Sequence, residues 1–252
     1  MKLRSQNIII TGGGSGIGKA VAKRLAEENI KVIICGRNQE KLERAKEDIN
    51  LNNVFVMTWD ISDISAFDIK INQAEALIGS KIGAFINAAA IGSSQCTKRG
   101  YEPWDITEEE WDCMSDINFK AAFFMMRNEV NYMLKNNIHG NILNIASNAA
   151  CMDIIGSYGA AKLSVIKWTR AFGKQYGHNG IIINGIAPGA TYTPMISHYA
   201  NDINQIYERH AIERFIRAEE IAELAYYLMS DYGEIICGHT VVADGGDNAA
   251  TL

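Results

Sequence analysis

The sequence predicts one α/β domain in which helices cover both faces of a seven-stranded parallel sheet, a doubly wound arrangement. Short runs rich in isoleucine and valine alternate along the chain with longer segments of helical period. The short runs are apolar at successive positions, as is typical of parallel strands buried on both faces. The length of 252 residues suits one sizeable domain, and no linker-like tract or repeat divides it. We therefore expect residues 1–252 to form a single domain.

The predicted strands and helices alternate along the chain, which favours right-handed crossovers between parallel strands. The strands are expected at Asn7–Thr11, Lys31–Cys35, Val54–Thr58, Gly83–Asn87, Asn141–Ile145, Ile181–Ile186 and Thr240–Ala243. The helices are expected at Ile17–Glu28, Gln39–Asn50, Ala66–Ile78, Glu108–Lys135, Tyr158–Tyr176 and Ala218–Ser230. Thr107, followed three residues later by Glu110, is typical of a capping box that opens the fourth helix.

The composition limits the classes of function. Hydrophobic residues make up 48% of the chain and charged residues 21%, so a packed core is expected. The net charge of -5 has the wrong sign for a nucleic-acid binder, and no basic run indicates a membrane-binding patch. No apolar segment is long enough for a signal-peptide core or a membrane span. The composition therefore predicts a soluble, cytoplasmic protein that binds neither nucleic acid nor membranes.

The cysteines suggest neither a disulfide framework nor a metal site. They are odd in number and widely scattered, at Cys35, Cys96, Cys113, Cys151 and Cys237. Close-paired spacings, which zinc sites and disulfide-rich scaffolds show, do not occur. The cysteine pattern therefore predicts a protein of a reducing compartment with no bound metal.

A glycine-rich turn follows the first predicted strand and opens the first helix. Gly12 allows a tight turn, Gly16 lets the backbone approach a phosphate, and Gly18 lets the helix pack closely on the sheet. The free amides at the start of the helix would then face the pyrophosphate. Because the motif stands between a strand and a helix, it predicts dinucleotide binding.

Tyr158 and Lys162 are spaced to share one face of a helix. They lie four positions apart, about one turn, in the small-residue segment GSYGAAK. An ammonium about 4 Å from the phenol contributes roughly 4 kcal/mol at an effective dielectric near 20, enough to lower the phenol pKa by up to about 3 units. The spacing therefore predicts a proton-transfer pair in which Lys162 lowers the pKa of Tyr158.

The chain carries two motifs in this order: Thr-Gly-x-x-x-Gly-x-Gly at 11–18 and Tyr-x-x-x-Lys at 158–162. With them it resembles the short-chain dehydrogenase/reductase family over nearly its whole length. The resemblance implies a Rossmann-type domain that interconverts a secondary alcohol and a ketone by hydride transfer with NAD(P)(H). It implies the catalytic residues Ser147, Tyr158, Lys162 and Asn118, and no metal. Tyr158 would be the general acid/base and Ser147 would bind the substrate oxygen. Lys162 would also hold the nicotinamide ribose, and Asn118 would anchor a water connecting Lys162 to solvent.

The resemblance also implies a set of cofactor-binding residues. These are Gly12, Gly14, Ser15, Gly16, Ile17, Gly18, Arg37, Asp60, Ile61, Asn87, Ala88, Ala89, Tyr158, Lys162, Pro188, Gly189, Thr191 and Thr193. The segment NAAA departs from the family, which prefers Asn at position 88 and Gly at position 90. The segment between Ser147 and Tyr158 is slightly shorter than usual, and Ser157 is the alternative hydroxyl.

The end of the second strand bears on the choice of cofactor. Folds that prefer NAD carry an acidic residue there, which binds the adenosine ribose. Here Gly36 takes that place and Arg37 follows, an arrangement that favours a 2′-phosphate. Ser15 argues the other way, because NADP-preferring relatives often carry a basic residue at its position. The sequence therefore predicts NADP(H), with NAD(H) as the alternative.

Three variable segments are expected to form the substrate wall: 91–106, 148–157 and 190–216. The last is long enough to close over the site as a lid. Lys98 and Arg99 suit an anionic group on the substrate, although a solvated loop explains them equally well. His198 and His210 are expected on a helix surface rather than at a metal.

The helices at 108–135 and 158–176 are apolar nearly all round, which indicates either a thick core or a subunit interface. With the resemblance, this predicts a homotetramer or homodimer through these helices.

Two other functions stay open. One is a 3-oxoacyl-[acyl-carrier-protein] reductase, although the acidic chain offers no basic docking face. The other is a non-catalytic nucleotide-binding scaffold or redox sensor, which would predict an incomplete set of catalytic residues. An enoyl reductase is disfavoured because its tyrosine and lysine are usually spaced more widely. The substrate and the physiological direction do not follow from the sequence.

Overall fold

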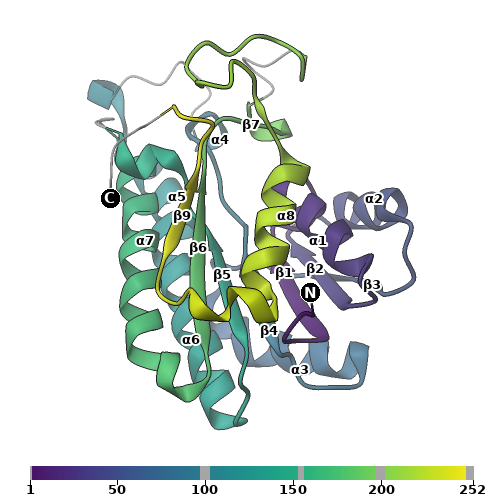
Figure 1. The fold of residues 1–252 in the computed structure, drawn as a ribbon. Coiled ribbons are helices and arrows are strands. Elements are labelled where there is room, and N and C mark those ends of the chain that lie inside the picture. The colour runs from purple at the N-terminus through teal and green to yellow at the C-terminus, as the bar shows by residue number, and fades with distance from the viewer. Residues whose placement is uncertain (1, 97–102, 153–155, 197–201, 248–252) are drawn as a thin grey trace.

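The computed structural model describes residues 2–96, 103–152, 156–196 and 202–247. A seven-stranded sheet runs through the centre in the order β3-β2-β1-β4-β5-β6-β9, and every neighbouring pair is parallel (Figure 1). The strands are β1 (Asn7–Thr11), β2 (Lys31–Gly36), β3 (Val54–Thr58), β4 (Ala84–Asn87), β5 (Asn141–Ile145), β6 (Ile182–Pro188) and β9 (Thr240–Ala243). The predicted seven-stranded parallel sheet is confirmed.

Helices cover both faces of this sheet. The main helices are α1 (Gly16–Ala26), α2 (Gln39–Ile49), α3 (Phe67–Ile78), α5 (Glu108–Ser115), α6 (Ala122–Lys135), α7 (Ser157–Tyr176) and α8 (Ala218–Met229). One hydrophobic core lies between the sheet and α1, α2 and α8, and a second lies between the sheet and α3, α5, α6 and α7. Figure 1 shows α6 and α7 on one side of the strands and α1 and α8 on the other. The doubly wound arrangement predicted from the alternation of elements is therefore confirmed.

The long predicted helix at 108–135 is divided. The capping box forms at its start: the Thr107 hydroxyl accepts from the Glu110 N–H at 3.3 Å, and Glu110 Oε2 accepts from the Thr107 N–H at 3.0 Å. After α5, a π-helical segment runs from Asp116 to Ala121 before α6 begins. π-Helical turns often occur at functional sites, and this one contains Asn118.

Several short elements lie near the carboxyl ends of the strands. They are the helix α4 (Ser93–Cys96) and a two-stranded parallel sheet formed by β7 (Thr191–Tyr192) and β8 (Ile216–Arg217). This small sheet joins the two ends of the segment predicted to form a lid. It was not predicted, because two-residue strands carry no periodic pattern.

The strand order reverses beside β1, since β2 and β4 lie on either side of it. Open α/β sheets bind ligands in the crevice outside the carboxyl ends of the strands at such a reversal. Gly12, Ala88 and Ser147 follow at or just after the ends of β1, β4 and β5. The fold thus brings three predicted motifs to the same edge of the sheet.

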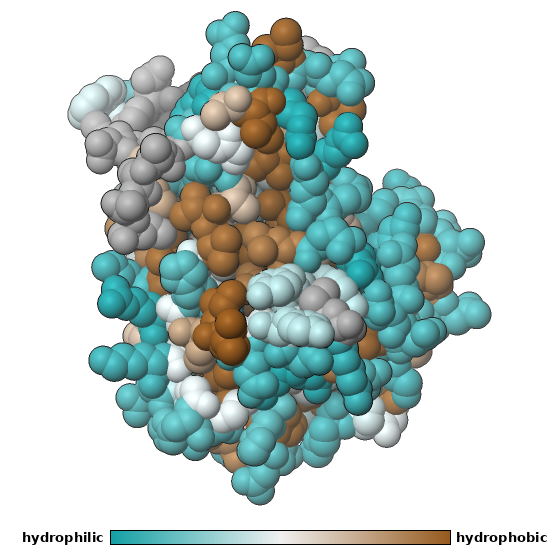
Figure 2. Space-filling model, viewed as in Figure 1, coloured by the Kyte–Doolittle hydropathy of each residue, from teal (hydrophilic) through white to brown (hydrophobic). Residues whose placement is uncertain are grey.

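Strand β9 forms one edge of the sheet. Figure 2 shows hydrophobic side chains gathered over this strand and its surroundings. Val241, Val242 and Ala243 are only partly buried, and β9 pairs with β6 alone among the described strands. This edge of the sheet is therefore apolar and partly exposed.

The scattered cysteines suggested that the protein has no disulfide, and this prediction is wrong. Cys96 and Cys113 are bonded, with their Cα atoms 6.0 Å apart and a sequence separation of 17. The fold brings α4 against α5, which the spacing alone does not indicate. Within the described ranges, no group of His, Cys, Asp and Glu residues could hold a metal ion. Nor is any of the described helices both long and apolar enough to span a membrane.

Candidate active site

Ser147, Tyr158 and Lys162 converge at the carboxyl end of β5. Ser147 lies two residues beyond the strand, and its hydroxyl accepts from the Ala149 N–H at 3.2 Å. Tyr158 lies in the first turn of α7 and hydrogen-bonds Ser147. One turn later, Lys162 Nζ donates to the Ile145 carbonyl at 2.9 Å and lies 5.8 Å from the centre of the Tyr158 ring. A hydroxyl, a phenol and an ammonium therefore share one small volume.

Burial controls the electrostatics of this group. It raises the pKa of Tyr158, while the hydrogen bond from Ser147 lowers it. Burial also lowers the pKa of Lys162 to about 8. The sequence predicted that Lys162 would lower the pKa of Tyr158, whereas in this structure Ser147 is the neighbour that does so. The difference arises because the spacing argument omitted desolvation, which disfavours the charged form of both groups.

A cavity of about 920 Å³ opens beside these residues. Its wall contains Ser147, Tyr158 and Lys162 and every residue predicted to bind the cofactor except Asn87. The alternative hydroxyl, Ser157, is buried and lies outside this wall. The volume is at the upper end of the range for ligand sites, as an extended ligand together with a substrate would require.

The glycine turn packs against the backbone after β4 and against itself more closely than any side chain would allow. Gly12 has a φ of +70°, and a Cβ there would lie 2.7 Å from the Ala89 nitrogen. A Cβ on Gly18 would lie 2.4 Å from the Gly12 carbonyl oxygen. Helix α1 begins at Gly16, and its N-cap Ser15 makes no side-chain capping bond. These residues fit a dinucleotide pyrophosphate at the helix N-terminus.

The alanines of the NAAA segment are compatible with this geometry. Among the described residues, the non-glycine positions with positive φ are Asn29, Asn50, Asn137 and Glu213. Ala90 is not one of them, so its Cβ introduces no backbone strain. Ala88, Ala89 and Ala90 all line the cavity.

The cavity becomes cationic beyond the end of β2. Arg37 and Lys41 are both exposed, and both line the wall next to Gly36. Asn38 caps α2 by accepting from the Lys41 N–H at 2.9 Å. Sequence reasoning missed Lys41, although its position in the first turn of the second helix, four residues after Arg37, was a readable signal. Asp60 follows β3, the strand next to β2; it lines the wall, and its carboxylate accepts from the N–H and the hydroxyl of Ser62.

Asn118 lies outside the cavity wall and hydrogen-bonds a residue that lines it. Its Nδ2 donates to the Ile91 carbonyl at 2.8 Å, and its Oδ1 accepts from the Ile91 N–H at 3.0 Å. Ile91 itself lines the cavity. The amide of Asn118 thus fixes the chain that follows β4, a contact that the expected water-anchoring role did not include.

Asn87 turns away from the cavity into a buried polar network. Its Nδ2 donates to Glu129 Oε2 at 2.9 Å and to Asn144 Oδ1 at 3.0 Å, and Asn144 donates to the Thr169 hydroxyl at 3.0 Å. Glu129 is fully buried in α6. Burial raises its pKa to about 8, against a lowering by the Asn87 hydrogen bond. The network joins α6, β4, β5 and α7, and a glutamate within an apolar helix was its sequence signal.

The predicted lid reaches the cavity through Tyr207 and Arg209. Arg209 Nε donates to Asp247 Oδ1 at 3.3 Å, and Asn148 Nδ2 donates to Asp247 Oδ2 at 2.9 Å. Asp247, which sequence reasoning missed, therefore links the lid to the residue after Ser147. The link comes from the chain beyond β9, which carries no recognisable motif.

His210 does not lie on a helix surface as predicted. It is fully buried, and its Nδ1 lies 2.7 Å from the Arg214 carbonyl, because the lid folds back against the turn that follows β9. Other candidates fall outside the described residues: Lys98, Arg99 and His198.

Comparisons with known proteins agree with this geometry. A family model described as enoyl-(acyl carrier protein) reductase matches residues 12–248. The levodione reductase of Leifsonia aquatica is 32% identical over 258 residues, which cover 96% of this chain and 94% of that protein.

Solved structures show the same fold. A short chain dehydrogenase from Bacillus anthracis has a TM-score of 0.82 at 30% identity, covering 98% of each chain. A 3-ketoacyl-(acyl-carrier-protein) reductase from Brucella melitensis, complexed with NADH, has a TM-score of 0.84 at 26% identity, covering 96% of this chain and 98% of that one. Together with the match of the family model, these similarities extend over nearly the whole molecule. The chain therefore belongs to the short-chain dehydrogenase/reductase family of nicotinamide-dependent oxidoreductases.

Proposed function

We propose that this protein interconverts a secondary alcohol and a ketone, using NADP(H) in preference to NAD(H). The observation that carries the proposal is the convergence of Ser147, Tyr158 and Lys162 in the wall of a cavity that also contains the glycine turn. The cofactor, when bound, supplies or accepts the hydride. A non-catalytic scaffold would not need a hydroxyl, a phenol and an ammonium placed together in this way.

The residues divide the proton chemistry between them. In the reducing direction, the Tyr158 hydroxyl gives its proton to the ketone oxygen, and in the oxidising direction the phenolate takes it back. The Ser147 hydroxyl donates a hydrogen bond to the same oxygen and stabilises the charge that develops there. The Lys162 ammonium favours the phenolate form of Tyr158 and binds the nicotinamide ribose. Asn118 holds Ile91, and with it the wall of the site.

Removal of one hydroxyl tests this assignment. In Tyr158→Phe the proton has no donor, so we expect kcat to fall by about 10²–10⁴-fold. Cofactor affinity should stay within about twofold, because the ring and Lys162 remain. The measurement follows nicotinamide absorbance with levodione, the ketone in the name of the relative, and with a panel of other ketones and alcohols.

Ser157→Ala is the matched control, because it removes a hydroxyl one residue away that lies outside the cavity wall. It should retain turnover. A Tyr158→Phe protein that turns over as fast as wild type would remove Tyr158 from its role. A wild-type protein that binds cofactor but reduces or oxidises nothing would favour the scaffold.

The preference for NADP(H) is supported by two cations, Arg37 and Lys41, at the place where an acidic residue would bind the ribose hydroxyls of NAD. In Arg37→Asp the new carboxylate would repel a 2′-phosphate, so we expect the ratio of kcat/KM for NADP(H) over NAD(H) to fall by at least about tenfold. Arg44→Asp is the matched control, because Arg44 pairs with Glu40 on the exposed side of α2. An increased ratio in Arg37→Asp would contradict the preference.

We also propose that the chain assembles as a homodimer or homotetramer through the helices at 108–135 and 158–176. Phe119 is 43% exposed and packs at 4.9 Å between ring centres on Trp168, which in turn contacts Phe123 at 5.2 Å. Leu163 is also exposed. A half-exposed aromatic cluster across two helices is typical of a subunit interface.

A further inference from the structure

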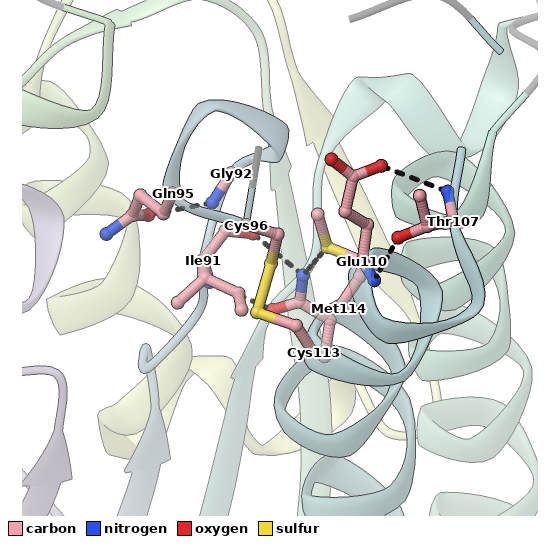
Figure 3. Close-up of a disulfide and its surroundings, with 9 residues drawn as sticks. Ile91, Gly92, Gln95, Cys96, Thr107, Glu110, Cys113 and Met114 are labelled. Atoms are coloured by element: carbon pink, nitrogen blue, oxygen red, sulfur yellow. Dashed lines mark hydrogen bonds between the residues drawn. A yellow bond between two sulfur atoms is a disulfide. The ribbon is translucent and has the colours of Figure 1, made fainter. Parts of the chain in front are cut away.

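The disulfide between Cys96 and Cys113 follows directly on a segment of the chain that lines the cavity. Cys96 ends α4 and is half-buried, whereas Cys113 lies in α5 and is exposed. Figure 3 shows the bridge running between the chain that carries Ile91, Gly92 and Gln95 and the helix that carries Glu110 and Met114. Ile91, Gly92 and Gln95 all line the cavity, so the bridge fastens one wall of the site to a helix.

This fastening runs parallel to a non-covalent one. Asn118, five residues after Cys113, holds Ile91, five residues before Cys96, through two hydrogen bonds of 2.8 and 3.0 Å. A further bond, from the Gly92 N–H to Gln95 Oε1 at 2.8 Å, stays within the wall and does not reach α5. The covalent link therefore adds to these hydrogen bonds and to the apolar packing of Ile91 with Met114 and Ile117.

The bridge is accessible to small reagents at one end. Exposed disulfides exchange with thiols more readily than buried ones do. Cys113 is exposed. Two cysteines outside the described disulfide serve for comparison: Cys35 is fully buried, and Cys237 is exposed. The bridge is therefore open to solvent at Cys113 and joined to the wall of the active site at Cys96.

We propose that Cys96 and Cys113 form a reversible thiol–disulfide exchange site, which takes low-molecular-weight thiols and disulfides and fixes the substrate wall in its oxidised state. The part of the proposal that concerns substrate rests on the proposed oxidoreductase function. The exchange itself does not depend on it.

The exchange balances as follows. A reagent thiolate attacks the exposed Cys113 sulfur, the bond between the two protein sulfurs breaks, and Cys96 leaves as a thiolate that takes a proton. A second reagent thiolate attacks the reagent sulfur of the mixed disulfide and releases Cys113 as a thiolate, which is likewise protonated. The protein disulfide gains two electrons and two protons, and two reagent thiols become one reagent disulfide. Oxidation by a reagent disulfide runs the same steps in reverse.

Reduction should loosen the wall and leave the nucleotide end of the cavity unchanged. Without the bridge, the Asn118 amide and the apolar packing of Ile91 with Met114 and Ile117 still hold Ile91 to α5 and its π-helical extension, but no covalent link does. We expect KM for the ketone to rise about 3–10-fold, with kcat changed less than KM, because the loss falls on substrate positioning. The cofactor dissociation constant should stay within about twofold, since the glycine turn and Arg37 lie on other elements.

The experiment uses the full chain equilibrated with reduced or oxidised glutathione, a monothiol and its disulfide. The thiols are counted by maleimide labelling and mass spectrometry, and KM and the cofactor dissociation constant are measured in each state. Hydrogen exchange over residues 91–107 gives a readout that needs no turnover. Cys96→Ser and Cys113→Ser remove the bridge, and Cys237→Ser is the matched control because it removes an exposed thiol outside it.

For both wild type and Cys237→Ser, the proposal expects the oxidised sample to have two fewer labelled thiols than the reduced sample of the same protein. The oxidised samples should also have the lower KM and the slower hydrogen exchange at 91–107. Cys96→Ser and Cys113→Ser should keep the high KM and the fast hydrogen exchange in both states. Labelling of Cys96 and Cys113 in every oxidised sample would overturn the exchange site. A bridge that forms without altering hydrogen exchange at 91–107 would overturn its effect on the wall. If no ketone is turned over in any state, the proposed function fails while labelling and hydrogen exchange still decide this proposal.

Discussion

Glu129 is fully buried in α6, and its carboxyl accepts a hydrogen bond from Asn87. Burial raises its pKa to about 8 from a usual value of 4.5. Between these values the folded chain keeps a proton that the unfolded chain has lost. The stability that the proton contributes is complete below pH 4.5 and is lost as the pH rises through about 8.

Replacing Glu129 by Gln removes this titration while keeping an oxygen for Asn87 to bond. We expect Glu129→Gln to be more stable than wild type by about 1–3 kcal/mol at pH 9, because wild type then buries a carboxylate. The advantage should shrink towards pH 5. Thermal unfolding at a series of pH values measures it, and comparison with wild type cancels the titration of Lys162.

Glu43→Gln, on the exposed side of α2, is the control, and its stability should follow wild type at every pH. A Glu129→Gln protein whose stability relative to wild type does not change with pH would show that Glu129 does not titrate on folding.

That Tyr158 and Lys162 lie together was readable from the sequence, but their environment was not. Tyr158 and Lys162 were found because a fixed spacing puts them on one helix face. Their pKa shifts depend on desolvation, which is decided by how the whole chain packs around them. Asp247 was missed for a related reason, since its partners Asn148 and Arg209 lie far from it in sequence.

At the scale of elements, hydrophobic periodicity predicted the long, regular strands and helices. The predicted bounds of β1, β3, β5 and β9 are the observed ones, because buried parallel strands are written as continuous apolar runs. The π-helical segment at Asp116–Ala121 was hidden inside a continuous helical pattern. It has no sequence signature of its own, since one extra residue in a turn does not break the apolar stripe.

The aromatic face of α7 and the π-helical segment gives an element-scale prediction. Phe119→Asp places a carboxylate in the proposed interface, where desolvating it is unfavourable. We expect the wild-type assembly to dissociate in this variant to the monomer mass of 27.8 kDa. Light scattering after size-exclusion chromatography, at several protein concentrations, measures the mass.

Ile69→Asp is the control, because Ile69 is 61% exposed on α3, outside the proposed interface. This variant should keep the wild-type mass. A monomeric wild type, or a Phe119→Asp protein that assembles as wild type does, would rule out an interface through Phe119.

At the scale of the whole molecule, parallel topology accounts for the site. Gly12, Ala88 and Ser147 are distant in sequence, yet they meet because parallel strands end at one edge of the sheet. This much followed from alternation and motif order. The bridge between Cys96 and Cys113 did not follow, because it depends on how a variable segment packs against α5, and cysteine spacing carries no such information.

The central proposal is that the charged ammonium of Lys162, 5.8 Å from the centre of the Tyr158 ring, lowers the proton affinity of the phenol in addition to the lowering by Ser147. Burial lowers the pKa of Lys162 to about 8, so the side chain is charged below that pH and loses its charge above it. The charged form favours the phenolate of Tyr158, and each unit of pKa change corresponds to about 1.4 kcal/mol. Lys162→Met removes the charge at every pH, whereas Lys167→Met removes an exposed charge from the same helix.

The most direct measurement is the pH dependence of kcat for alcohol oxidation at saturating cofactor in wild type, Lys162→Met and Lys167→Met. We expect Lys162→Met to move the ionisation of Tyr158 to higher pH by at least about one unit and to lower kcat at pH 7 by about 10²-fold. Lys167→Met should match wild type. A Lys162→Met profile that coincides with that of wild type would contradict the account.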